Sequence, residues 1–194
     1  MARARVRPFD ALVVVDMQLD FMPGGALPVP GADEIVGRVN EYVELFTRAG
    51  AAVVFTRDWH PPNHISFRTR GGPWPPHCVQ GTPGASFHPG LRIPRDALVV
   101  SKATDPNREA YSGFEGTELD AELRRRGVRR LFVCGVATEY CVKATALDGV
   151  RLGYQVLLLA DAVRGVNSPP NLVRRAIDEM LDAGVVLVEM GDLE

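Results

Sequence analysis

Six short runs of apolar, mostly β-branched residues recur along the chain, each about as long as a β-strand. Between most of them lie longer segments in which apolar residues recur at helical spacing. The expected strands are residues 11–15, 51–55, 98–100, 131–134, 155–159 and 185–188, and the expected helices are residues 32–49, 117–126, 139–152 and 171–183. Continuous apolar strands that alternate with amphipathic helices are typical of a parallel sheet with helices on both faces. We therefore predict an α/β fold with three layers.

Each expected helix is followed by a glycine. The four are Gly50, Gly127, Gly153 and Gly184. Glycine at this position commonly ends a helix in the left-handed conformation, so the four positions support the helix assignments. No repeat, low-complexity tract or linker divides the chain, and we expect a single domain over residues 1–194.

The segment 59–96 departs from this alternation. It has no clear periodicity, and it holds eight of the fifteen prolines, all four histidines and both tryptophans. A loop this long in a compact domain is usually functional or disordered, and its aromatic and histidine content argues against disorder. We interpret it as an ordered, proline-stiffened loop that builds a site.

Composition and charge narrow the classes of function. The formal net charge is −2 and the two signs are intermixed, so nothing indicates nucleic acid or an anionic membrane as a partner. The apolar run at 11–15 is too short for a secretory signal, and no segment is long enough to span a bilayer. Three cysteines without a C-x-x-C pattern argue against a disulfide framework. We expect a cytoplasmic protein.

Cys141 is the candidate nucleophile. The strand at 131–134 leads directly into a helix, which places Cys141 in the first helical turn beyond the carboxyl end of a strand. A helix N-terminus favours a thiolate over a thiol, and open α/β sheets bind ligands at this edge. Cys134 lies inside an apolar strand and is expected to pack in the core, whereas Cys78 is either a packing thiol or a metal ligand.

Asp16 and Lys102 also follow expected strands closely. Asp16 is either a cap or turn residue, or a partly desolvated general base that can take a thiol proton. Lys102 is one of only two lysines among 22 basic residues, and a compact ammonium suits a site where the planar fork of arginine does not. A surface ion pair is the alternative for Lys102. A thiol, a carboxylate and an amine from three strand ends are the layout expected of a hydrolytic triad.

A possible metal site follows the second expected strand. Asp58 and His60 alternate on an extended backbone, which directs both side chains to one face, and His64 and His77 follow in the long loop. Carboxylate and imidazole ligands suit zinc, iron or manganese. The alternative is that the histidines are hydrogen-bonded among the prolines and tryptophans, as we expect for His88.

Six blocks of the sequence resemble those of a known protein family. In order they are VVVDMQLDFMPGGAL, TRDWHPPNHISF, GGPWPPHCVQGTPGA, SKATDP, AYSGFEGT and CGVATEYCVKATALD. With these blocks the chain resembles the nicotinamidases of the isochorismatase-like cysteine hydrolase family from about residue 10 to residue 190. The resemblance implies the isochorismatase-like hydrolase fold, a six-stranded parallel sheet with helices on both faces.

The resemblance also implies roles for individual residues. Asp16, Lys102 and Cys141 would form the catalytic triad. One divalent metal would be held by Asp58, His60 and His77, with an open position for the pyridine nitrogen of the substrate. His64 is a possible further ligand.

The same resemblance implies an oxyanion hole and a substrate pocket. A cis Val136–Ala137 peptide would aim the amides of Ala137 and Cys141 at the oxyanion. The residues expected to contact the substrate are Phe21, Trp74, Tyr111, Val136 and Ala137, with ordinary core packing as the alternative for Phe21.

The activity that the resemblance implies is hydrolysis of nicotinamide to nicotinate and ammonia through a Cys141 thioester, in NAD salvage, with pyrazinamide as a further substrate. True isochorismatases lack the cysteine, and relatives that act on carbamoyl or ureido amides generally lack the DWH and WPPHC motifs. Zinc is the expected metal, with iron or manganese as alternatives, and a homo-oligomer is expected. A broader amidase and a metal-holding binding protein without catalysis remain open.

Overall fold

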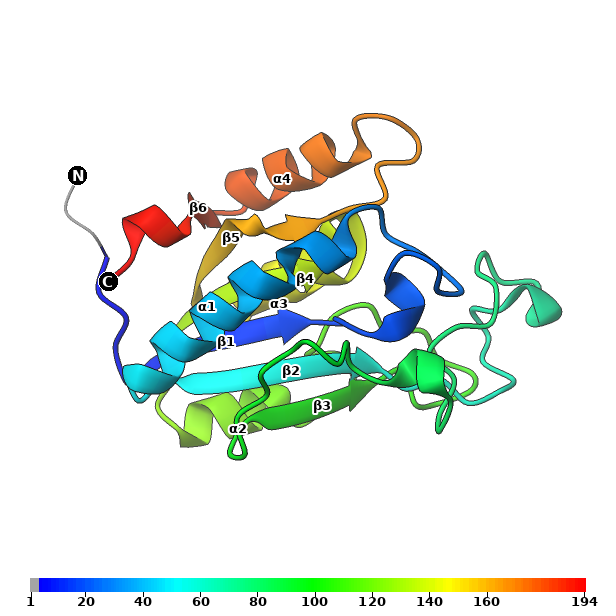
Figure 1. Ribbon diagram of the computed structural model, residues 1–194, viewed down its shortest axis with the longest axis horizontal. Coiled ribbons are helices and arrows are strands. Elements are labelled where there is room, and N and C mark those ends of the chain that lie inside the picture. Colours follow the sequence, from blue (N-terminus) through cyan, green and yellow to red (C-terminus); the bar gives the residue numbers. More distant parts are fainter. Residues whose placement is uncertain (1–3) are drawn as a thin grey trace.

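A parallel sheet of six strands forms the centre of the computed structural model, which describes residues 4–194 (Figure 1). The strand order is β3-β2-β1-β4-β5-β6, and every neighbouring pair is parallel. The strands are β1 Asp10–Val15, β2 Ala52–Asp58, β3 Leu98–Lys102, β4 Arg130–Val136, β5 Gln155–Arg164 and β6 Val186–Val188. The predicted fold class is confirmed, and residues 1–3 of the predicted domain lie outside the described residues.

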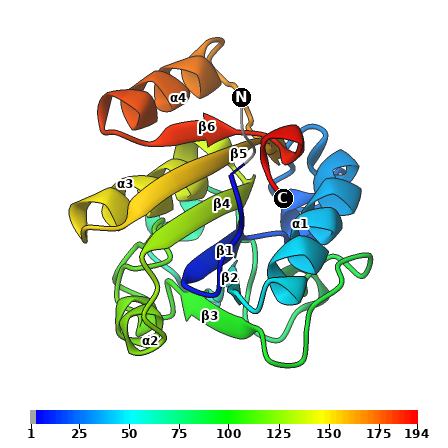
Figure 2. The ribbon, with the colours of Figure 1, turned by 90° about the vertical axis from the view of Figure 1, so that its left-hand side faces the viewer.

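Helices cover both faces of this sheet (Figure 2). They are α1 Val36–Arg48, α2 Leu119–Arg125, α3 Lys143–Arg151 and α4 Leu172–Asp182. Helix α1 packs with Leu12 and Val14 on one face, whereas α2, α3 and α4 pack with Val13 and Val15 on the other. Because alternate residues of β1 point to opposite faces, this strand is buried on both sides and is apolar after its first residue.

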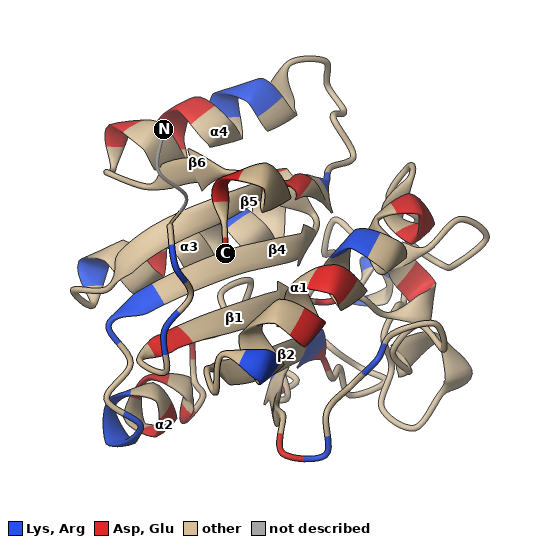
Figure 3. Cartoon of the chain, turned by 60° about the vertical axis from the view of Figure 1, so that its left-hand side comes forward, with Lys and Arg blue, Asp and Glu red and all other residues tan. Residues whose placement is uncertain are grey.

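The positions of the charged residues follow from this layering. Strands β1 and β4 carry a charged residue only at their first positions, while the helices carry charges on their outer surfaces (Figure 3). The middle of these two strands is therefore apolar. The buried Asp10 pairs with Arg130 at their amino ends, whereas Asp16, Asp58 and Lys102 are buried at the carboxyl edge of the sheet.

The four predicted helix-ending glycines all have positive φ, between 68° and 99°. Two element boundaries differ from expectation. Strand β5 continues to Arg164 instead of ending at 159, because after a register shift its backbone pairs again with β4, Val163 with Gly135 and Arg164 with Val136. Asp161 within this extension accepts a hydrogen bond from Tyr42 and pairs with Arg38. The helix expected at 139–152 begins as a π-helical turn, Thr138–Val142, before α3.

The long loop 59–96 is ordered at the carboxyl end of the strands, on the right in Figure 1. Its helical structure is limited to two 3₁₀ turns, Arg68–Arg70 and Pro83–Ala85. Isolated β-bridges pair His60 with Val79 and Phe67 with Trp74, so the loop folds back on itself. Across residues 4–194, no helix combines the length and the apolar character needed to cross a membrane.

Candidate active site

Three buried ionisable side chains meet at the carboxyl edge of the sheet. Asp16 follows β1, Lys102 ends β3, and Cys141 lies in the π-helical turn after β4. The Lys102 Nζ is 2.9 Å from Asp16 Oδ2 and 3.4 Å from Cys141 Sγ. Asp16 and Lys102 are at most 1% exposed, and Cys141 is 6% exposed. The structure thus brings together the three residues that the sequence proposed as a triad.

Asp16 is held by its backbone and by a neighbouring strand. Its φ is 50°, a left-handed conformation that turns the chain sharply at the end of β1. The Thr56 hydroxyl of β2 donates a 2.8 Å hydrogen bond to Asp16 Oδ1. The carboxylate is therefore fixed on one oxygen while the other faces Lys102.

The charges within this group follow from burial and proximity. Burial raises the pKa of Asp16. Burial also raises the pKa of the Cys141 thiol well above its ordinary value; the Lys102 ammonium lowers that pKa, but burial and the carboxylates of Asp16 and Asp58 outweigh it. Burial by itself would lower the pKa of Lys102, but the two carboxylates outweigh it and raise that pKa. The resting group therefore holds an ammonium and a neutral thiol. This differs from the thiolate expected at a helix N-terminus, because the sulfur is buried beside two carboxylates.

A second group of side chains adjoins the first. One potential ligand atom from each of Asp58, His60 and His77 lies within 4.8 Å of the others, and all three residues are buried. Asp58 Oδ1 is 2.5 Å from Lys102 Nζ, and Asp58 Oδ2 is 3.9 Å from His77 Nε2. The carboxylate of Asp58 thus belongs to both groups.

The tautomers of the two histidines suit metal binding. His60 Nδ1 lies 3.0 Å from the carbonyl oxygen of His77, and His77 Nδ1 lies 2.8 Å from that of Pro75. Because a carbonyl only accepts, each Nδ1 carries a proton, which leaves each Nε2 as the nitrogen that could bind a metal. His60 Nε2 is buried without a hydrogen-bond partner, and burial lowers the pKa of His60 to about 4. Two imidazoles and one carboxylate, with an orphaned buried nitrogen among them, fit a divalent cation.

The other loop residues considered as ligands are engaged elsewhere. His64 Nδ1 lies 2.7 Å from Ser66 Oγ and its Nε2 lies 2.9 Å from the carbonyl oxygen of Arg108, so neither ring nitrogen is free. His64 is close to His60 and Glu109, but its ring packs against the His60 ring there. His88 accepts a hydrogen bond from the Gly90 amide, which is a structural contact.

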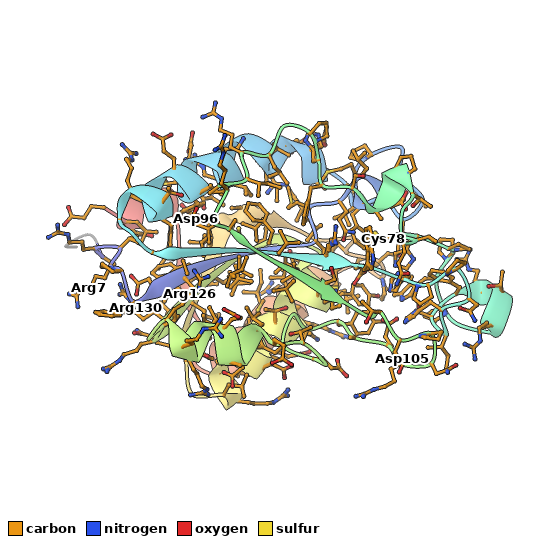
Figure 4. The ribbon with its side chains drawn as sticks, turned by 90° about the horizontal axis from the view of Figure 1, so that it is seen from below. Arg7, Cys78, Asp96, Asp105, Arg126 and Arg130 are labelled. Atoms are coloured by element: carbon orange, nitrogen blue, oxygen red, sulfur yellow. The ribbon has the colours of Figure 1, made fainter. Side chains whose placement is uncertain are left out.

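Cys78 is buried, and burial raises the pKa of its thiol well above the ordinary value. It lies near the same end of the sheet as the site, whereas Arg7, Arg126 and Arg130 lie at the opposite end (Figure 4). These three arginines therefore take no part in this site, and Cys78 is a packing residue among the described contacts.

A cavity of about 220 Å³ opens onto both groups. Sites for drug-sized ligands usually measure about 300–1,000 Å³, so this cavity suits a smaller molecule. Predicted pocket residues that line it are Phe21, Trp74, Tyr111 and Ala137, together with Asp58, His77 and Cys141. Val136 does not line it, because its side chain is buried in the core on the α1 side. The Val136–Ala137 peptide is cis, as the resemblance implied.

The sequence did not single out several of the lining residues, which are Leu27, Pro28, Val29, Tyr140, Val166 and Ser168. Tyr140 packs edge-on against Trp74, with ring centroids 5.3 Å apart, and the Trp74 Nε1–H donates to the Tyr111 hydroxyl at 3.1 Å. These three rings form one aromatic wall. Tyr140 is adjacent to the nucleophile in sequence, but which way it points depends on the π-helical turn, which the spacing does not reveal.

Gln18 is a further residue that the sequence analysis missed. Its Nε2 donates to the carbonyl oxygens of Asp58 at 2.8 Å and Ala85 at 2.9 Å, and its Oε1 accepts the Asp58 amide at 2.8 Å. The buried Gln18 side chain therefore bonds the Asp58 backbone as an adjacent strand would, and it holds that backbone in place. In the sequence, the only sign of this role is a polar residue two positions after Asp16.

Comparisons with known proteins agree with this geometry. The isochorismatase domain model matches residues 10–192. A nicotinamidase of Escherichia coli (strain K12) is 39% identical over 208 residues, which cover 96% of this chain and 98% of that protein. The crystal structure of a pyrazinamidase of Pyrococcus horikoshii in complex with zinc is 59% identical with a TM-score of 0.91, over 94% of this chain and 100% of that one. A structure of PnC1 from L. infantum in complex with nicotinate is 39% identical with a TM-score of 0.90, over 99% and 98%.

Proposed function

The chain belongs to the isochorismatase domain family, and on that premise we propose that it is a metal-containing cysteine amidohydrolase that converts nicotinamide to nicotinate and ammonia. The observation that carries this proposal is Lys102, whose ammonium contacts Asp16 and Cys141 and also Asp58 of the neighbouring histidine group. One ring-sized cavity opens onto both groups. A nucleophile and a site for a pyridine nitrogen would thus serve a single small amide.

Asp16 begins the reaction as the base. Its carboxylate takes the Cys141 proton, and the Lys102 ammonium, 3.4 Å from Sγ, stabilises the thiolate that forms. This transfer is required because burial keeps the resting Cys141 thiol neutral. The thiolate then attacks the carboxamide carbon, and the carbonyl oxygen gains negative charge.

The next steps break the amide and release the acid. We assign the amides of Ala137 and Cys141 to the oxyanion, where such a donor is typically worth about 3–4 kcal/mol. Protonated Asp16 gives its proton to the departing nitrogen, so ammonia leaves and a Cys141 thioester remains. Asp16 then takes a proton from water as that water attacks the thioester. Nicotinate leaves, and the thiol regains the proton.

Asp58, His60 and His77 would hold the divalent metal. When bound, it supplies a Lewis acid that binds the pyridine nitrogen and orients the ring. Phe21, Trp74 and Tyr111 contribute apolar walls to the cavity that receives the ring, and Phe21 also packs edge-on against His77. We propose zinc as the metal, because the Pyrococcus horikoshii relative was crystallised with zinc.

The proposal extends to the cellular context. Nicotinate produced by this reaction would feed NAD salvage in the cytoplasm, and pyrazinamide, a close ring analogue, would be a second substrate. We also propose that the chain forms a homo-oligomer, which sedimentation analysis of the purified protein would test.

An ammonia-release assay tests the function. The zinc-loaded protein should release ammonia and nicotinate in equal amounts from nicotinamide, and dialysis against a chelator should remove both the metal and the turnover until zinc is restored. His60→Ala should lower bound zinc and turnover together. His88→Ala removes a ring whose Nδ1 accepts a hydrogen bond from the nearby Gly90 amide, and it should leave both intact. Zinc-loaded protein that releases no ammonia from nicotinamide would overturn the proposal.

A further inference from the structure

The segment of residues 165–168 forms one wall of the cavity. It connects the end of β5 at Arg164 with α4, along the orange connection in Figure 1. Val166 and Ser168 line the cavity, as Trp74 of the long loop does. The segment belongs to no helix or strand, so its position must be fixed by contacts from outside it.

Glu139 supplies those contacts from the nucleophile's own turn. It lies two residues before Cys141, and its side chain is buried, with only 4% of the residue exposed. Its Oε1 accepts hydrogen bonds from the backbone amides of Val166 and Asn167, each at 2.8 Å. A carboxylate that accepts two backbone N–H groups in a buried site forms strong, charge-assisted hydrogen bonds. Both of these hydrogen bonds therefore tie the segment to the turn that carries the nucleophile.

Gly165 shows how closely the segment approaches this carboxylate. A Cβ on Gly165 would lie 2.2 Å from Glu139 Oε2 and 2.3 Å from Val173 Cγ2, so a side chain there would require one of these groups or the segment to shift. Glu139 Oε2 is itself buried without a hydrogen-bond partner. The carboxylate is therefore enclosed by the segment as well as bonded to it, and the two observations are independent of each other.

We infer that Glu139 is a positioning residue that sets the distance between the Val166 and Ser168 wall and Cys141, and so determines how tightly the substrate ring is held. The inference rests on the proposed function for its substrate, but the geometry does not depend on which amide is bound. Because Glu139 bonds to the segment and not to Asp16, Lys102 or Cys141, its loss should weaken substrate binding more than it slows the chemical steps.

Glu139→Ala tests this directly. We expect KM for nicotinamide to rise about 10- to 100-fold, the range that corresponds to loss of a hydrogen bond to a charged group, with kcat changed less than about threefold. Hydrogen exchange at the Val166 and Asn167 amides, followed by NMR without substrate, should accelerate in parallel. Glu139→Gln keeps an acceptor oxygen and should restore most of the binding. Glu179→Gln removes an exposed carboxylate of α4 that pairs with Lys143, and it should leave KM and amide exchange unchanged.

Gly165→Ala tests the same contact by a change in the segment instead of in Glu139. It provides the test if Glu139→Ala does not fold. The added methyl group cannot fit beside Glu139 Oε2 and Val173 Cγ2 without a shift that disturbs the contact between Glu139 and the segment, so KM should again rise while kcat is retained. The inference is wrong if either variant folds and keeps the wild-type KM and amide exchange, or if kcat falls while KM is unchanged. A wild-type protein that protects both amides but does not hydrolyse nicotinamide would instead count against the proposed function alone.

Discussion

Lys102 is a fully buried ammonium with three polar neighbours. It contacts Asp16 Oδ2, Asp58 Oδ1 and Cys141 Sγ, and thereby joins the nucleophile to the histidine group. An arginine could not take its place easily, because a planar guanidinium needs more space and more acceptors than this site offers. The rarity of lysine in the chain was therefore a meaningful signal of this position.

The Cys141 thiol should be protonated at rest. Burial raises its pKa well above the usual value, so the protonated form persists as the pH rises through the range in which an ordinary thiol ionises, about 8.5. Thiolate absorbance near 240 nm reports the ionisation of the Cys141 thiol. It is measured as a function of pH, as the difference between the wild type and Cys141→Ala. We expect no thiolate signal at pH 7, and a signal with a midpoint below 8 would contradict the assignment of Asp16 as the required base.

Asp16→Asn should separate proton transfer from binding. The amide has the shape of the carboxylate but cannot take the thiol proton, so kcat should fall about 10²- to 10⁴-fold, the usual contribution of a general base. Nicotinate binding, measured by calorimetry, should change little. Asp33→Asn, at an exposed position in the 3₁₀ turn Ala32–Ile35, is the matched control and should keep full turnover. Normal kcat in Asp16→Asn would assign the base to another residue.

Strands β1 and β4 approach each other unusually closely beside the site. Gly135 pairs with Val15, has a φ of 107°, and a Cβ on it would lie 2.2 Å from the Val15 carbonyl oxygen. The glycine lies directly before the cis Val136–Ala137 peptide and opposite the residue that precedes Asp16. The close approach of the two strands therefore determines the spacing between the base and the nucleophile's turn.

Gly135→Ala should destabilise the protein by at least about 2 kcal/mol, because the methyl group meets backbone atoms that cannot move aside. Gly37→Ala is the matched control, since Gly37 lies in α1 and a Cβ there meets nothing within 4 Å. Alanine is the better helix former, so this control should gain about 0.5–1 kcal/mol. Urea unfolding monitored by circular dichroism gives both values. Equal stability of the two variants would show that the strands can separate at Gly135 without cost.

For the molecule as a whole, the hydrophobic pattern was enough to predict the architecture. A strand buried on both faces, such as β1, has a continuous apolar run, and its end at Asp16 is visible because a charged residue interrupts that run. Parallel strands place their carboxyl ends at one edge, so Lys102 and Cys141 could be expected at the same edge as Asp16. The residue types and their places at three strand ends suggested a hydrolytic triad, and the resemblance implied the substrate on which it acts.

Other features depend on contacts between distant segments and leave little trace in the local sequence. The extension of β5 depends on renewed pairing with β4, and Asp161 within it contacts Tyr42 and Arg38, which lie far away in the chain. The Asp58 backbone is bonded by Gln18, and the Val166 and Asn167 amides are bonded by Glu139. In each case the partner belongs to a remote segment, which neither periodicity nor composition can reveal.

The central claim is that Cys141 attacks the amide of nicotinamide, and turnover by Cys141→Ala tests it most directly. The zinc-loaded variant should bind zinc and nicotinamide as the wild type does, while ammonia release falls by about 10⁴-fold or more, as expected when a nucleophile is removed. A Cys141→Ala protein that still releases ammonia within tenfold of the wild-type rate would contradict the account.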